Sequence, residues 1–149
     1  MSTPRVLILC TGNACRSQMA EALLKAAAAK AGLIMDVESA GTRPAMAVHP
    51  RAAAAMHQIG MDIHNAIPKS VFLFVGQRFD YVITVCDDAA ETCPIFPGQC
   101  TRIHWPTFDP SSLPPGNEAT LAAAFAHTRD ELAARINQWL ATLGKKTNG

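Results

Sequence analysis

Short strand-like segments alternate along this chain with alanine- and leucine-rich segments, and few folds are compatible with that alternation. The apolar run from Val6 to Leu9 is typical of a fully buried strand, and residues 16–31 favour helix. Strands that alternate with helices predict a parallel α/β sheet with right-handed crossovers. The length of 149 residues predicts a single domain over residues 1–149.

The remaining predicted elements continue the alternation. Further strands are predicted at residues 34–40, 81–85 and 102–105, and further helices at 50–59 and 118–143, with a helical turn or two between 68 and 75. Glycines at 32, 60 and 144 are expected to end the helices before them. Residues 108–116 contain three prolines and are expected to form a loop, and residues 145–149 are expected to fray.

Composition argues against several classes of protein. The formal net charge is +1, whereas nucleic-acid-binding domains usually carry a strongly basic face. No apolar run approaches the roughly 20 residues of a membrane helix, and the run from Val6 to Cys10 is too short for an export signal. Five cysteines in a chain with a full-sized core argue against a disulfide scaffold. We therefore expect a cytoplasmic protein that binds neither nucleic acid nor membranes.

The segment CTGNACRS leaves the first predicted strand and opens the first predicted helix. Such a loop gathers backbone N–H groups at the positive end of a helix dipole, which predicts an anion site. Gly12 and Asn13 tolerate the left-handed conformations that a tight loop requires, and Arg16 can bind two oxygens of a tetrahedral oxyanion. The predicted oxyanion-binding residues are Thr11, Gly12, Asn13, Ala14, Cys15, Arg16 and Ser17.

Cys10 lies at the base of this loop and is the predicted nucleophile. The N–H groups, the dipole and Arg16 are expected to favour its thiolate and to lower its pKa to roughly 3.5–7.5. A thiolate beneath a bound oxyanion is directed at the central atom. The Gly-Lys-Ser/Thr signature of a nucleotide-binding loop is absent from this segment.

This loop resembles the phosphate-binding loop of the low-molecular-weight protein tyrosine phosphatases and of the arsenate reductases related to them. The resemblance continues through SAGT at 39–42, HPR at 49–51 and Asp109-Pro110, and it covers about residues 5–139. It implies a four-stranded parallel sheet flanked by helices, with the anion site at the carboxyl end of the first strand. It also implies that Asp109 is a general acid, although a turn residue before a proline is the alternative.

A second cysteine cluster distinguishes the reductases from the phosphatases. Cys86 directly follows the strand at 81–85, and neighbouring parallel strands bring their carboxyl ends to one edge, so we expect Cys86 on the same rim as Cys10. In a straight helix the Cα atoms of Cys86 and Cys93 would be about 10.5 Å apart, too far for a disulfide unless the segment unwinds. The segment resembles that of the thioredoxin-linked arsenate reductases, which carry two resolving cysteines at this spacing.

The resemblance implies that arsenate is reduced by a thiol relay through Cys10, Cys86 and Cys93, with Arg16 and Asp109 assisting. The expected reductant is an external dithiol such as thioredoxin rather than glutaredoxin or glutathione, and no bound cofactor or metal is expected. The alternatives are a protein tyrosine phosphatase and a redox-responsive binding protein. Those phosphatases tend to carry aromatic residues after the Asp-Pro, whereas Ser111-Ser112-Leu113 follow here.

The spacing of the other thiols leaves further alternatives open. Cys86, Cys93 and Cys100 recur every seven residues, but Pro94 and Pro97 disfavour one continuous helix. A zinc site from these thiols and His104 would lack a CxxC unit, and Cys15 and Cys100 are expected to be structural or incidental.

Some thioredoxin-linked reductases bind potassium through residues matching Asn13, Glu21 and Ser39 plus a downstream aspartate. Residues 65–70 contain Lys69 and no acid. Because a lysine there would repel a cation, we expect such a site to be absent or weak.

Overall fold

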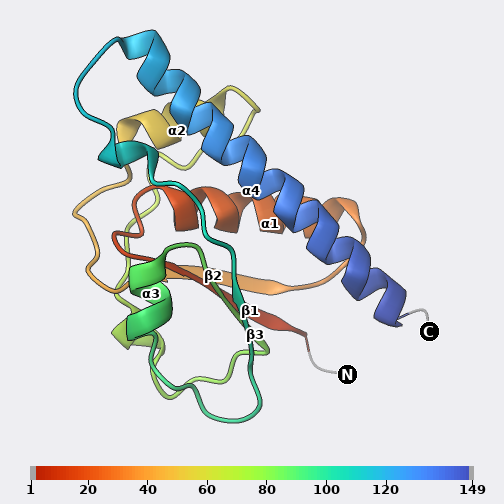
Figure 1. The fold of residues 1–149 in the computed structure, drawn as a ribbon. Helices are drawn as coiled ribbons and strands as arrows, with labels where there is room; N and C mark the ends of the chain where they lie inside the picture. The colour runs from red at the N-terminus through yellow and green to blue at the C-terminus, as the bar shows by residue number, and fades with distance from the viewer. Residues whose placement is uncertain (1–2, 148–149) are drawn as a thin grey trace.

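A central β-sheet positions the helices and loops of the molecule. The computed structural model describes residues 3–147, with the side chains of residues 88, 91, 92 and 144–147 left undescribed. Its strands are β1 (Arg5–Cys10), β2 (Asp36–Gly41), β3 (Tyr81–Thr84) and β4 (Thr101–His104). They form one parallel sheet in the order β2-β1-β3-β4 (Figure 1), which confirms the predicted four-stranded parallel sheet.

The helices cover both faces of this sheet. They are α1 (Arg16–Lys30), α2 (Pro50–His57), α3 (Asp87–Thr92) and α4 (Glu118–Thr147), with short 3₁₀ turns η1 (Val71–Phe74) and η2 (Pro110–Ser112). The steps from β1 to β2 and from β3 to β4 run in opposite directions, so right-handed crossovers place α1 and α3 on opposite faces. Helices α1, α2 and α4 lie together, whereas α3 lies beside the carboxyl ends of β1 and β3 (Figure 1).

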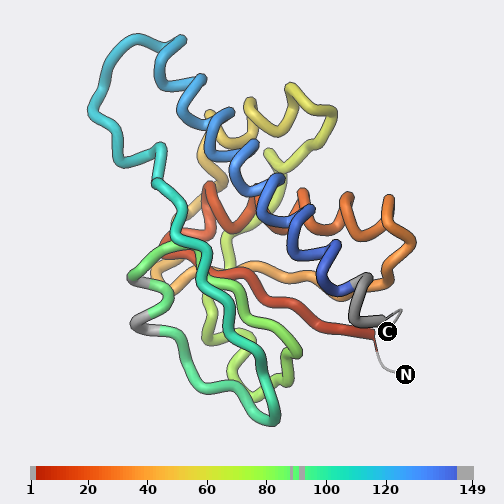
Figure 2. Tube along the Cα trace, turned by 45° about the vertical axis from the view of Figure 1, so that its right-hand side comes forward, coloured from red at the N-terminus to blue at the C-terminus, as the bar shows by residue number. Residues whose placement is uncertain are grey.

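The core forms between β1 and the helices. Residues Val6 to Leu9 are completely buried, as their continuous apolar run predicted. Helix α4 packs on both α1 and α2 (Figure 2), with Leu132 and Ile136 fully buried. His49 caps α2, since its Nδ1 accepts the N–H of Arg51 at 3.1 Å. No helix within residues 3–147 is long and apolar enough to cross a membrane.

Several element boundaries differ from the sequence predictions, and two of these differences have a clear physical reason. Strand β2 begins at Asp36 rather than at residue 34, because Ile34 is exposed and outside the sheet, and it extends to Gly41, which pairs with Cys10. Helix α4 continues through residue 144 to Thr147, so that glycine does not end it. A glycine inside a helix costs only about 1 kcal/mol, which its neighbours can offset. Residues 145–147, predicted to fray, are thus helical, and 148–149 lie outside the described residues.

Candidate active site

The loop between β1 and α1 is held by the segment that follows β2. Its carbonyl groups accept hydrogen bonds from backbone N–H groups of that segment. From N–H donor to carbonyl acceptor, these bonds are Thr42 to Cys10 at 3.2 Å, Arg43 to Thr11 at 2.9 Å, Ala45 to Gly12 at 2.9 Å and His49 to Ala14 at 2.8 Å. A planar trans peptide directs its N–H opposite to its C=O. The N–H groups that follow these carbonyls therefore point the other way, and that of Asn13 donates to Cys10 Sγ at 3.2 Å. The loop carbonyls are thus paired with the segment after β2, and the N–H of Asn13 faces the Cys10 sulfur.

Two residues make the tight curvature of the loop possible. Asn13 has a φ of +51°, the left-handed conformation that asparagine adopts more readily than most residues. Gly41 lies against the outside of the loop, where a Cβ atom would come within 2.5 Å of Thr11 O and 2.9 Å of Asn13 N. Only glycine allows β2 to approach the loop this closely.

Cys10 is buried at the base of the loop, and its Sγ lies 2.8 Å from Ser17 Oγ. Burial raises the pKa of the Cys10 thiol above its ordinary value, while the hydrogen bonds from Ser17 and Asn13 and the charge of Arg16 act to lower it. The net rise corrects the sequence prediction of a lowered pKa. Strand β1 and the loop exclude water from the Cys10 sulfur. This loss of hydration raises its pKa by more than the surrounding hydrogen-bond donors lower it.

Arg16 and Asp109 meet at the edge of the loop. One guanidinium nitrogen of Arg16 donates to Thr107 O at 3.1 Å, and another lies 3.4 Å from Asp109 Oδ2. The other carboxylate oxygen of Asp109 accepts from the N–H and the hydroxyl of Ser111, at 3.0 and 2.6 Å. Asp109 is therefore both a turn residue that caps η2 and a neighbour of the anion loop.

Cys86 lies on the rim of the same loop, as the parallel topology predicted. Its Sγ is 3.3 Å from Thr11 Oγ1 and accepts the N–H of Ala89 at 3.3 Å, so it caps α3. A shallow pocket between the loop and α3 is lined by Arg16, Cys86, Asp87 and residues 106–108. The thiol thus stands at the entrance to the site.

Cys93 lies at the opposite end of α3, so the helix separates it from Cys86. Burial raises the pKa of the half-buried Cys93 thiol, and the nearby Arg102 acts to lower it. All five cysteines are free thiols. Cys15 is buried within the loop, and burial raises its pKa too, whereas Cys100 lies outside the loop before β4.

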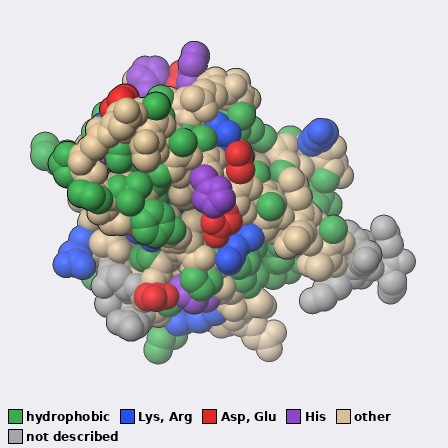
Figure 3. Space-filling view, turned by 45° about the horizontal axis from the view of Figure 1, so that its top comes forward, with side chains coloured by type: hydrophobic (Ala, Val, Ile, Leu, Met, Phe, Trp, Pro, Cys, Tyr) green, Lys and Arg blue, Asp and Glu red, His purple; other side chains and the backbone are tan. Residues whose placement is uncertain are grey.

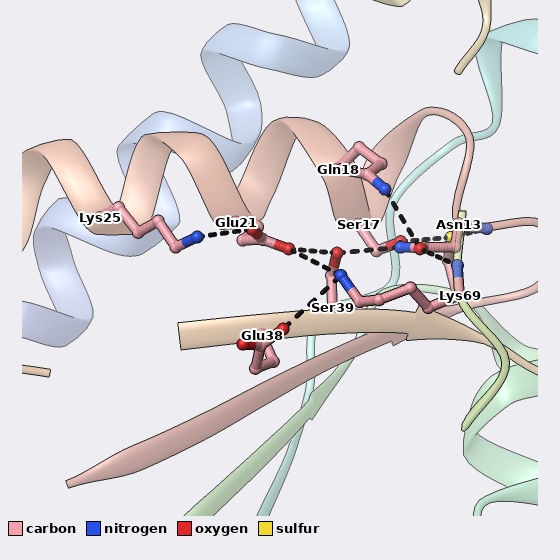
Figure 4. Close-up of polar contacts among 9 residues, drawn as sticks. Asn13, Ser17, Gln18, Glu21, Lys25, Glu38, Ser39 and Lys69 are labelled. Atoms are coloured by element: carbon pink, nitrogen blue, oxygen red, sulfur yellow. Dashed lines mark hydrogen bonds and ion pairs between the residues drawn. The ribbon is translucent and has the colours of Figure 1, made fainter. Parts of the chain in front are cut away.

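Several polar side chains behind the loop were not predicted from sequence as parts of the site. Gln18 donates to Asn13 Oδ1 at 3.1 Å, and the ammonium of Lys69 lies 4.0 Å from Glu21 Oε1 and 3.5 Å from Glu38 Oε2 (Figure 4). The ammonium thus lies beside Glu21, one of the residues that match the potassium ligands of some thioredoxin-linked reductases. No sequence signal identified Gln18 or the carbonyl of Thr107, because their roles depend on contacts across the fold.

The surface carries charges of both signs. On the face in Figure 3, acidic and basic side chains are interspersed among polar and apolar ones. Among the residues whose side chains are described, no group of three or more His, Cys, Asp and Glu is placed to hold a metal ion.

Comparison with known proteins shows which protein family and which enzymes this chain resembles. The family model for low molecular weight phosphotyrosine protein phosphatases matches residues 5–148. The chain is 38% identical to an arsenate reductase of Halalkalibacterium halodurans and 37% identical to one of Bacillus subtilis, each over 142 residues that cover 95% of this chain and 99% of the relative.

Solved structures give the same result. An arsenate reductase in the phosphate-binding state matches with a TM-score of 0.76 and 27% identity, covering 94% of this chain and 98% of that one. A thioredoxin-dependent arsenate reductase of Corynebacterium glutamicum matches with a TM-score of 0.68 and 30% identity, covering 97% of this chain and 63% of that one.

Proposed function

Because the chain belongs to the low molecular weight phosphotyrosine protein phosphatase family, we propose that Cys10 in its anion loop begins a thiol relay that continues through Cys86 and Cys93. The activity is the reduction of arsenate to arsenite, as in relatives 36–38% identical over nearly their whole length. The observation that carries the relay is the contact between Thr11 of the anion loop and Cys86, which brings a second thiol to the rim of the loop.

The relay begins with Cys10. Arsenate is bound by the loop N–H groups and Arg16, and the Cys10 thiolate attacks arsenic to form a sulfur–arsenic bond. One arsenate oxygen leaves as water after protonation, and Asp109, which lies 3.4 Å from Arg16, is placed to supply the proton. Because burial raises the pKa of Cys10, a bound arsenate dianion is a suitable acceptor for the thiol proton.

The next two steps transfer electrons through disulfides. Cys86 attacks Cys10 Sγ, a Cys10–Cys86 disulfide forms, and the sulfur–arsenic bonding pair stays with arsenic, which leaves as arsenite. Cys93 then attacks Cys86 and releases Cys10 as a thiolate. Two thiols have become one disulfide, which balances the two electrons gained by arsenic.

The Cys86–Cys93 disulfide needs an external reductant. Thioredoxin is the proposed partner, supported by the likeness to the thioredoxin-dependent enzyme of Corynebacterium glutamicum and by the position of both cysteines at the ends of one short helix. The free thiols of the chain fit a reducing compartment such as the cytoplasm.

Single-turnover mass spectrometry of cysteine variants tests the relay. Cys93→Ser should release one equivalent of arsenite and stop with a Cys10–Cys86 disulfide, because nothing displaces Cys10. Cys86→Ser should release none, and Cys10→Ser should be inactive, while Cys100→Ser serves as the control with normal turnover. Normal cycling of Cys93→Ser with thioredoxin would show that the relay is wrong and that two thiols suffice.

The same loop supports slow phosphatase activity as a second proposal. Phosphate and arsenate are both tetrahedral oxyanions, and the arsenate reductase matched at a TM-score of 0.76 is described in a phosphate-binding state. Hydrolysis of a small aryl phosphate should require Cys10 and Asp109 but neither Cys86 nor Cys93. A Cys86→Ser protein that lost aryl phosphate hydrolysis while folding normally would contradict this division of roles.

A further inference from the structure

A line of side-chain hydrogen bonds runs behind the anion loop from Cys10 to helix α1 and strand β2, and Figure 4 shows its part from Asn13 to Glu21. The amide Nδ2 of Asn13 donates to Ser17 Oγ at 2.8 Å and to Ser39 Oγ at 2.9 Å. Ser39 Oγ in turn donates to Glu21 Oε1 at 2.5 Å. Because Ser17 already accepts from Asn13, its own hydroxyl proton is free to point at Cys10 Sγ, 2.8 Å away.

The backbone of Lys69 determines which way the Asn13 amide faces. The N–H of Lys69 donates to Asn13 Oδ1 at 2.8 Å, and a backbone N–H can only donate. The oxygen of the amide must therefore face Lys69, and its NH₂ group must face Ser17 and Ser39. Lys69 is itself fixed, because its carbonyl accepts the N–H of Gly41 at 2.8 Å.

The side chain of Lys69 acts on the other end of the same line. Its ammonium lies 4.0 Å from Glu21 Oε1, the oxygen that accepts from Ser39, and 3.5 Å from Glu38 Oε2. The Glu21 side chain is only 15% exposed, and its two oxygens face different cations, Oε1 the ammonium of Lys69 and Oε2 that of Lys25 at 2.7 Å. Glu21 Oε1 accepts the hydrogen bond of the Ser39 hydroxyl, which leaves the lone pairs of the Ser39 oxygen free to accept from Asn13.

We propose that Lys69 is a positioning residue for Cys10, which holds the Asn13 amide through its backbone and the Glu21 carboxylate through its ammonium. It touches neither the sulfur nor the anion loop's binding face. Its effect passes through Asn13 to Ser17, whose hydrogen bond is the largest influence opposing the effect of burial on Cys10. This inference rests on the assignment of Cys10 as the nucleophile.

The ammonium also acts as a tethered monovalent cation. Arsenate reduction by the unaltered protein should be the same in potassium chloride and in choline chloride at equal ionic strength. In Lys69→Ala, the carboxylates of Glu21 and Glu38 lose that neighbour, and potassium should restore part of the activity that choline does not. Equal activity of Lys69→Ala in both salts at the level of the unaltered protein would overturn the proposal.

A direct test measures the ionisation of Cys10 without arsenate, from thiolate absorbance against pH after subtraction of the matching Cys10→Ser protein. Lys69→Met should lower the ionised fraction of Cys10 at neutral pH by roughly threefold to tenfold, where tenfold corresponds to one pKa unit. Lys69→Arg should stay close to the unaltered protein. The matched control is Lys25→Met, because Lys25 bonds the other Glu21 oxygen at 2.7 Å from an exposed position. It should change the ionised fraction by less than about twofold.

The outcomes separate this inference from the proposed function. An ionised fraction in Lys69→Met equal to that of the unaltered protein, or an equal loss in Lys25→Met, would overturn the role of Lys69 even if Cys10 is the nucleophile. Turnover of arsenate by Cys10→Ser would instead overturn the proposed function. If Lys69→Met fails to fold, Lys69→Gln supplies the same test, since it keeps a long polar side chain, removes the positive charge beside Glu21 and should lower the ionised fraction in the same direction.

Discussion

Two opposing influences set the pKa of Cys10: burial raises it, and hydrogen bonds lower it. Burial raises its pKa, so less of the thiol is ionised at neutral pH than in an exposed cysteine, and ionisation must increase as the pH rises. The hydroxyl of Ser17, the N–H of Asn13 and the charge of Arg16 limit that rise. The rate at which a neutral alkylating reagent modifies Cys10 should therefore increase towards alkaline pH in the absence of bound anion.

Ser17→Ala tests this balance at a single residue. Losing a hydrogen bond to a charged group costs roughly 1.5–3 kcal/mol, so the pKa of Cys10 should move further upward and its ionised fraction near neutral pH should drop roughly tenfold or more. Thiolate absorbance against pH measures the change. Ser111→Ala, near the site but bonded to Asp109 rather than Cys10, is the control. An unchanged titration in Ser17→Ala would mean that this hydroxyl does not stabilise the thiolate.

At the scale of elements, the carboxyl end of β2 supports the anion loop from outside. Gly41→Ala should displace the loop, because the added methyl would meet backbone atoms of Thr11 and Asn13 that cannot move independently. Overpacking of this kind costs typically 1–3 kcal/mol in stability. Arsenate turnover should fall by more than the unfolded fraction explains.

Gly116→Ala is the matched control for that substitution. Its methyl would meet nothing closer than the carbonyl oxygen of Pro114 at 3.9 Å. Chemical denaturation and initial rates of both variants provide the measurement. A Gly41→Ala protein with the stability and rate of Gly116→Ala would show that the loop tolerates a wider approach of β2.

At the scale of the whole molecule, the strand order brings two of the three thiols of the proposed relay to one edge of the sheet. Strands β1 and β3 are neighbours although some 70 residues separate them in the sequence, so Cys10 and Cys86 emerge side by side. The order in which successive strands are added to the sheet reverses between β1 and β3, and ligand sites of parallel sheets form at such points. Only Cys93 is held away, by α3.

Oxidation should therefore unfold α3 and leave the rest of the molecule intact. A Cys86–Cys93 disulfide needs Cα atoms closer than about 7 Å, which the straight helix does not allow. Amide hydrogen exchange of the oxidised protein should show lost protection in residues 87–93 and unchanged protection in α1 and α4. Retained protection of α3 in a protein shown by mass spectrometry to hold that disulfide would refute the required unwinding.

The sequence by itself determined the alternating fold, the anion loop, the position of Cys10 beneath it and the placement of Cys86 on the same rim. These follow from local patterns and from the rules of parallel sheets. Only the tertiary structure decided the contact of Lys69 with Asn13, the pairing of Arg16 with Asp109 and the net direction of the Cys10 pKa. Asn13 and Lys69 are 56 residues apart, and no pattern links them. The pKa of a thiol depends on everything that encloses it, and enclosure exists only once the chain has folded.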